Sequence, residues 1–202
     1  MLELFQKGGF LMYPIAICSI VALAVFLERL WALRHGKVVP QELLLEVLDL
    51  LAKGKLTEAQ TLCRRWNSPL AEVIYTGLLH YGKDRSTIKE RMEEVGRHEV
   101  AELERHINVI GTVAAVAPLL GLLGTVTGMI KSFNVIAAQG VAEPQSLAGG
   151  ISEALLTTAA GLIVAIPAVI MYRYLSSKVR SLSLEMEAAA LRVLELLGTE
   201  RK

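Results

Sequence analysis

Residues 117–130 read A-P-L-L-G-L-L-G-T-V-T-G-M-I, and residues 150–168 read G-I-S-E-A-L-L-T-T-A-A-G-L-I-V-A-I-P-A. Both stretches combine small residues with threonines and carry almost no charge. They lie in or overlap two long apolar segments, 107–130 and 154–172, and a third such segment covers 8–27. Each segment has about the 20 residues that a helix needs to cross the hydrocarbon core of a bilayer. The sequence therefore predicts an all-α integral membrane protein with three transmembrane helices.

The composition agrees with this prediction. At 53% hydrophobic residues and a mean hydropathy of +0.46, the chain is too apolar for an ordinary soluble domain, yet 20% of its 202 residues are charged. Charge and hydrophobicity must therefore be segregated along the sequence. The net charge of +1 gives no reason to expect nucleic acid as a partner. Cys18 lies in an apolar run and Cys63 in a charged one, so no disulfide is expected between them.

The first apolar segment has a second interpretation, as a cleaved signal peptide. A signal peptide carries its positive charge before the apolar core, whereas Arg29, Arg34 and Lys37 come after it here. The triplet Ala22-Leu23-Ala24 resembles a cleavage site but lies inside the apolar run. We therefore interpret this segment as an uncleaved membrane anchor.

The lysines and arginines predict the orientation. Twelve of the 21 fall between Arg34 and Arg105, and six more lie from Arg173 onward. The stretch between the second and third segments offers only Lys131, and the N-terminus only Lys7. Because cytoplasmic loops carry the excess of positive charge, the large loop and the C-terminus are expected in the cytoplasm. The N-terminus is then expected on the periplasmic side of a bacterial inner membrane.

The large loop is expected to be a small helical domain. Pro40 and Gly54 are typical of the start and end of a helix, and an apolar stripe lies between them at Leu43, Leu44, Val47, Leu48 and Leu51. A second helix is predicted over 56–66 and a third over 70–81, closed by Gly82.

Thr87 and Glu90 have the spacing of a capping box, which predicts the start of a long helix. Since no proline lies between Glu90 and the second apolar segment, we expect one unbroken helix to about residue 137, roughly 75 Å long. The C-terminal segment carries a similar apolar stripe at Leu182, Met186, Ala189, Val193 and Leu197. Periodicity alone leaves open whether this stripe packs within its own chain or against copies of it.

These segments predict the organisation of the chain. It comprises an N-terminal segment with the first transmembrane helix (1–34), a cytoplasmic helical domain (35–106), the second transmembrane helix (107–138), a short periplasmic link (139–150), the third transmembrane helix (151–174) and a cytoplasmic C-terminal helix (175–202). Two of the three membrane helices thus extend into the cytoplasm.

Small residues form stripes on the second and third segments. Gly121, Gly124 and Gly128 recur at i, i+3 and i+7, and Gly161 with Ala165 makes a similar surface. Such stripes allow another helix backbone to approach closely, so these glycines are candidate helix-packing residues. By themselves they indicate plain packing rather than function.

Polar groups in the same segments are the candidate functional residues. Thr125, Thr157 and Thr158 stand in otherwise apolar runs, where a hydroxyl can satisfy itself on its own helix. Glu153 heads the third segment. An acid within a membrane normally faces a cavity or a partner, whereas an acid at the boundary can simply be solvated. Both interpretations of Glu153 stay open on the residues alone.

At these residues the chain resembles a known family. Residues 121–128 and 151–162, with the similarity continuing through 166–168, resemble the paired signatures of the MotA/TolQ/ExbB ion-channel family. Three spans and a cytoplasmic domain of about 70 residues are closer to the ExbB/TolQ branch than to the flagellar stator subunit. The resemblance implies a proton channel subunit that couples the proton motive force to mechanical work on the envelope, in energised import or envelope maintenance.

The resemblance also implies an assembly. Five copies would form a ring around a dimer of an ExbD/TolR-like protein, whose single membrane helix supplies an aspartate, and a TonB- or TolA-like protein is a further expected partner. Thr125 and Thr158 match the family's pore threonines, and Glu153 matches its pore-region glutamate. Thr157 stands where the family often has alanine, so the choice between Thr157 and Thr158 as the pore-lining hydroxyl stays open.

Other function classes are weaker. No nucleophile–base pair, phosphate loop or HExxH motif appears, so we expect neither an enzyme nor a catalytic residue, and no cofactor. His98, Glu102 and His106 recur every four residues, but a charge-rich helix produces such triplets by chance, and we expect no metal site. The alternative that stays open is a passive oligomeric membrane scaffold or pore without energy coupling.

Overall fold

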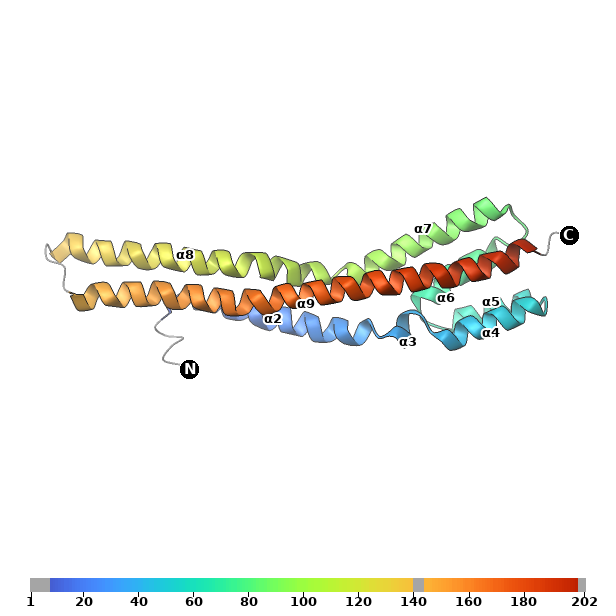
Figure 1. Ribbon diagram of the computed structural model, residues 1–202, viewed down its shortest axis with the longest axis horizontal. Helices are drawn as coiled ribbons and strands as arrows, with labels where there is room; N and C mark the ends of the chain where they lie inside the picture. The colour runs from blue at the N-terminus through green and yellow to red at the C-terminus, as the bar shows by residue number, and fades with distance from the viewer. Residues whose placement is uncertain (1–7, 140–143, 200–202) are drawn as a thin grey trace. The chain divides into compact units, whose positions relative to one another are not determined.

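The computed structural model describes residues 8–139 and 144–199, and all regular structure in these ranges is helical (Figure 1). The helices, in chain order, are α2 (Met12–Ala32), α3 (His35–Val38), α4 (Gln41–Ala52), α5 (Leu56–Arg65), α6 (Pro69–Leu79), α7 (Arg85–Glu104), α8 (Ile107–Gln139) and α9 (Pro144–Thr199). α2, α8 and α9 are long and apolar enough to cross a membrane. The link predicted for 139–150 lies partly outside the described residues, and α9 already begins within it, at Pro144.

The chain divides into two compact units. The first holds the residues up to Glu28 with His106–Tyr174, and the second holds Arg29–Arg105 with the residues from Leu175 onward. α2 and α9 each contribute to both units, and α9 is a continuous helix of 56 residues.

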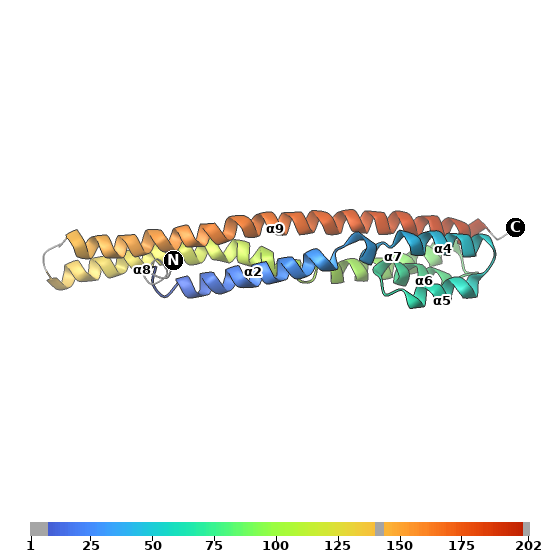
Figure 2. The same ribbon diagram turned by 90° about the horizontal axis from the view of Figure 1, so that it is seen from below.

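In the first unit, α8 and the first half of α9 run antiparallel and side by side, as both views show (Figures 1 and 2). Their buried positions recur every three to four residues, and from Ala117 onward they are small. They are Ile107, Ile110, Val113, Ala117, Gly121, Gly124, Gly128 and Ser132 on α8, and Ala154, Thr157, Gly161, Ala165 and Ala168 on α9. This spacing gives each helix one face that the other can cover. Many larger apolar side chains, such as Leu122 and Ile163, are exposed.

The second unit packs around long aliphatic side chains. The predicted stripe of α4 is buried at Leu43, Leu44, Val47 and Leu51. α5 packs against α4 and α6, and α6 packs against α7. The C-terminal stripe that sequence left open is buried within the chain itself, because Leu182, Met186, Ala189, Val193 and Leu197 are all at most 7% exposed. It therefore needs no second copy to cover it.

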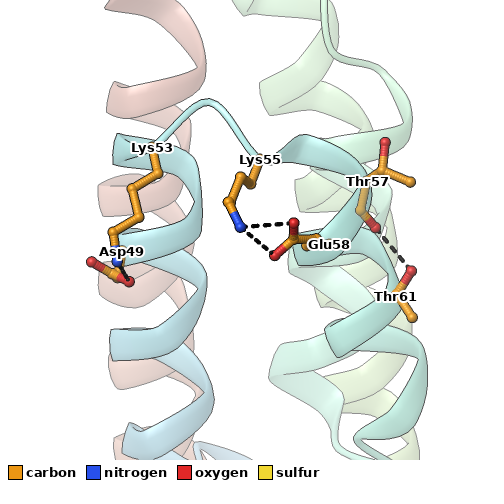
Figure 3. Close-up of polar contacts among 6 residues, drawn as sticks. All are labelled: Asp49, Lys53, Lys55, Thr57, Glu58 and Thr61. Carbon is orange, nitrogen blue, oxygen red and sulfur yellow. Dashed lines mark hydrogen bonds and ion pairs between the residues drawn. The ribbon is translucent and has the colours of Figure 1, made fainter.

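Gly54 ends α4 as its sequence predicts. Its backbone has φ +71°, the left-handed conformation that glycine adopts without strain. The N–H of Gly54 donates to the Leu51 carbonyl and that of Lys55 to the Leu50 carbonyl, both at 2.9 Å, which is the Schellman pattern. Figure 3 shows the ion pairs on either side of this turn, Lys53 with Asp49 and Lys55 with Glu58.

Two expectations about the long helix are wrong. It begins at Arg85 rather than at a Thr87 cap, since the Ile88 N–H already donates to the Asp84 carbonyl at 3.0 Å. It also does not run unbroken into α8, because α7 ends at Glu104 and α8 begins at Ile107.

At the break, the backbone tightens next to a long-range side-chain contact that the sequence does not signal. The Arg105 N–H donates to the carbonyl three residues back, at Glu102, as in a tightened 3₁₀ turn. The guanidinium of the buried Arg29 lies 3.5 Å from the Leu103 carbonyl oxygen. A side chain that takes a carbonyl from the helical ladder is a recognised cause of a helix break.

Candidate functional site

The contact between α8 and α9 depends on glycines of both helices. A methyl group at Gly161 would lie 2.6 Å from the Ala117 carbonyl oxygen, and one at Gly121 would lie 3.1 Å from the Thr158 Cα. At Gly128 the obstacle would be the Gly150 carbonyl oxygen at 2.7 Å. These neighbours are backbone atoms, which no rotamer change can move. Glycine is therefore required for the two helices to lie this close.

Gly124 makes the same kind of contact with a side chain. A methyl group there would lie 2.5 Å from Cγ2 of Thr157. Thr157 is only 1% exposed, and its hydroxyl oxygen lies 2.8 Å from both the Gly8 and the Glu153 carbonyl oxygens. A hydroxyl has one proton, so it donates to one of these carbonyls at a time. The hydroxyl of Thr157 is thus engaged inside its own chain.

Thr158 and Thr125 are less enclosed. The Thr158 hydroxyl donates across the helix pair to the Gly121 carbonyl at 2.9 Å, and the Thr125 hydroxyl donates to the Leu122 carbonyl of its own helix at 2.6 Å. Both residues are half-buried. Each hydroxyl oxygen keeps lone pairs after donating its proton, so it can still accept a hydrogen bond from another molecule.

Glu153 is paired within the chain. Its carboxylate oxygen lies 2.5 Å from the ammonium nitrogen of Lys131, which stands near the end of α8. The Glu153 side chain is 22% exposed and that of Lys131 is 59% exposed. The carboxylate also lies against the backbone of Gly9, where a Cβ would overlap it. The carboxylate is therefore paired with a cation and only partly exposed to solvent.

The candidate residues fall on two sides of α9. Thr157 is four residues after Glu153, about 40° around the helix, and both contact the segment of Gly8 and Gly9. Thr158 is five residues after Glu153, about 140° around, and contacts α8 instead. Of the three threonines and the acid, the structure thus groups Glu153 with Thr157 and leaves Thr158 and Thr125 apart from them.

Sequence reasoning missed Lys131 as the partner of Glu153. The small-residue stripes of α8 and α9 carried the available signal. Because the two helices are antiparallel, successive contacts pair later residues of α8 with earlier residues of α9: Gly121 with Thr158, Gly124 with Thr157 and Gly128 with Ala154. Continuing this register brings Lys131 to the first turns of α9. No sequence signal marks the contact of Thr157 with Gly8, which joins residues 149 positions apart.

The shifted ionisable groups lie outside the membrane helices. Burial raises the pKa of the Cys63 thiol to about 12, so the thiol is neutral and a poor nucleophile. Burial also raises the pKa of Glu99, Glu72 adds to the rise, and the adjacent His98 opposes it. His106 lies beyond the end of α7 and so leaves the helical face that His98 and Glu102 share.

Comparison with known proteins gives consistent similarities. Residues 65–188 match the model of the MotA/TolQ/ExbB proton channel family. The chain is 34% identical over 203 residues to the putative biopolymer transport protein ExbB-like 1 of Synechocystis, an alignment that covers 99% of this chain and 80% of that protein. It is 41% identical over 115 residues to the biopolymer transport protein ExbB of Aquifex aeolicus, which covers 57% of this chain and 77% of that protein. It is 43% identical over 84 residues to the Tol-Pal system protein TolQ of Haemophilus influenzae, which covers 42% of this chain and 37% of that protein.

Proposed function

Because the chain belongs to the MotA/TolQ/ExbB proton channel family, we propose that it is the multi-span subunit of an ExbB–ExbD or TolQ–TolR type complex. In this role it couples the proton motive force across a bacterial inner membrane to mechanical work on the cell envelope. The work is energised import or envelope maintenance, delivered through a TonB- or TolA-like protein.

The observation that carries this proposal is the chemistry of the α8–α9 pair. Thr125 and Thr158 present half-buried hydroxyls on two closely packed apolar helices, and aspartate occurs in none of α2, α8 and α9. Hydroxyl oxygens can accept a hydrogen bond from a protonated carboxyl group and can solvate its ionised form. They cannot carry protons by themselves at neutral pH. The titrating acid then comes from a partner, for which an ExbD/TolR-like membrane aspartate is suited.

Ring formation is the second part of the proposal. α8 and α9 expose many large apolar side chains, among them Leu119, Leu122, Val126, Leu155, Ile163 and Ile166. In a bilayer, lipid covers some of these side chains, and helices of neighbouring copies cover others through van der Waals packing. We propose a homopentamer in which α8 and α9 line the centre and α2 lies toward lipid. The path past Thr125 and Thr158 then has Glu153 and Thr157 beside it.

The same proposal includes the orientation. The basic residues of the second unit belong on the cytoplasmic side, with the C-terminus, and the N-terminus belongs on the periplasmic side.

Co-expression with the partner tests assembly directly. The chain is expressed together with any adjacent reading frame that encodes a single-span protein with a membrane aspartate, and the complex is purified in mild detergent. Native mass spectrometry should report five copies of this chain with two of the partner. A stable monomer would refute the ring. A ring that never retains the partner would favour a passive scaffold or pore.

A further inference from the structure

A polar cluster lies apart from Thr125 and Thr158. It consists of Lys131 on α8, Glu153 and Thr157 on α9, and Gly8 and Gly9 ahead of α2. The ammonium–carboxylate distance is 2.5 Å, and the Thr157 hydroxyl lies 2.8 Å from the Gly8 carbonyl oxygen. Three segments that are distant in sequence therefore meet through charged and hydrogen-bonding groups.

Gly9 has the properties that such a junction requires. Its φ of +73° is a left-handed conformation, and a Cβ at this position would overlap the Glu153 carboxylate. The Gly9 carbonyl accepts a hydrogen bond from the Met12 N–H at 3.2 Å, and the Phe10 carbonyl accepts one from Tyr13 at 3.3 Å. The residues held against Glu153 are thus the ones that start α2.

Lys131 is the cation that the Glu153 carboxylate contacts. Without the ammonium group, a carboxylate that is largely covered would lose its counter-ion and would turn toward water or a neighbouring charge. The backbone of Gly9 would then lose its packing surface.

We propose that Lys131 is a positioning residue for Glu153. Its ammonium group holds the carboxylate on the side of the helix pair that carries Gly8 and Gly9, and so fastens the start of α2 to α8 and α9. This inference rests on the proposed function in one respect: Glu153 stays paired during ion transfer, and the hydroxyls of Thr125 and Thr158 are the groups that meet the partner's acid.

Hydrogen exchange of the purified full-length chain tests the junction. The variants are Lys131→Gln, Glu153→Gln and the conservative Lys131→Arg. Each glutamine variant should speed amide exchange in a peptide covering 8–15 by about tenfold, because the ion pair that holds the Glu153 carboxylate against Gly9 is lost. Lys131→Arg keeps both the pair and the carboxylate, so it should exchange as slowly as the wild type.

Ser132→Ala is the matched control. It removes the adjacent buried hydroxyl, which donates only to the Gly128 carbonyl of its own helix at 3.2 Å. Exchange over 8–15 should stay at the wild-type rate in this control. Wild-type exchange in both glutamine variants, or a Lys131→Arg variant that exchanges as fast as they do, would overturn the proposal.

This readout is separate from the test of the proposed function, since it needs no ion gradient and no partner. Ion-driven activity provides the second half of the test. In the complex with its co-expressed partner, Lys131→Arg and Lys131→Gln should both keep the wild-type pH profile of proton uptake, because the positioning role leaves proton exchange to the partner's acid. A shifted profile in Lys131→Gln would show that Glu153 itself exchanges protons and would overturn the positioning role. If the wild-type complex takes up no protons, the proposed function fails, while the exchange result still decides the junction.

Discussion

Replacing Gly161 by alanine perturbs a close backbone contact between α8 and α9. The added methyl group would lie 2.6 Å from the Ala117 carbonyl oxygen and 3.1 Å from the Gly121 Cα, both of them backbone atoms. Since no side chain can rotate away, the helices must separate by several tenths of an ångström. Overpacking of this kind costs about 1–3 kcal/mol.

Part of this cost is offset because alanine favours the helical conformation over glycine by about 1 kcal/mol. The net loss relative to the wild type is then about 0–2 kcal/mol. For a chain of this length each kcal/mol lowers the midpoint by roughly 2–4 °C, so the expected decrease in Tm is at most about 8 °C.

The assay is thermal unfolding in mild detergent, followed by circular dichroism at the helical band. Gly149→Ala is the matched control, because it lies on the same helix and a Cβ there would meet nothing within 4 Å. It should keep or slightly raise the Tm through the helix preference of alanine. If Gly161→Ala melts at or above the temperature of Gly149→Ala, the close backbone contact at Gly161 is refuted.

Three further predictions concern the second unit. In a Cys18→Ser background at pH 8, Cys63 should react with a maleimide at least about tenfold more slowly in the folded protein than in guanidinium. Burial raises the pKa of the Cys63 thiol to about 12 and so keeps the thiol neutral. Equal reaction rates in the two states would contradict the burial of Cys63. Glu99→Gln should stabilise the protein at pH 7 but not below pH 4.5, the ordinary pKa of the Glu99 carboxyl. The pKa of Glu99 is raised in the folded protein, so ionising this carboxyl costs stability as the pH rises through the folded-state pKa. A difference in denaturant midpoint that does not change with pH would count against this. Gly54→Ala should lower the free energy of unfolding by about 1 kcal/mol in the same denaturant assay. A φ of +71° at position 54 is strained for any residue with a side chain, although no atom lies within 4 Å of an added Cβ. An unchanged denaturant midpoint would refute this strain.

Local patterns predicted much of the fold. The apolar runs of α2, α8 and α9, the stripe of α4 and the stop at Gly54 all depend on residues close together in sequence. The break after Glu104 does not, because it depends on Arg29, a residue 74 positions before the carbonyl that it contacts. A residue pattern on one helix cannot report such a contact.

The candidate site divides in the same way. The glycines and threonines were identifiable from their spacing in apolar segments, and the family resemblance singled out Glu153. The partners of Glu153 and Thr157 were not identifiable, because Lys131 and Gly8 reach them only when α8, α9 and the start of α2 are packed together. The pore-lining role of the threonines stays a prediction.

Proton uptake by the reconstituted complex tests the central claim most directly. Proteoliposomes that contain this chain and its co-expressed partner are energised with a proton gradient, and uptake is followed with a pH-sensitive dye. Thr125→Val and Thr158→Val preserve side-chain size and remove the hydroxyl, so each should keep the assembly intact and reduce uptake by about tenfold or more, as expected when a polar group in an ion path is lost.

Thr112→Val is the control, because Thr112 lies on the same helix α8 about 20 Å before Thr125 and, like Thr125, donates to a carbonyl of its own helix, that of Asn108. It should retain wild-type uptake. Wild-type uptake in both the Thr125 and Thr158 variants, at normal assembly, would contradict the account that these hydroxyls line the ion path.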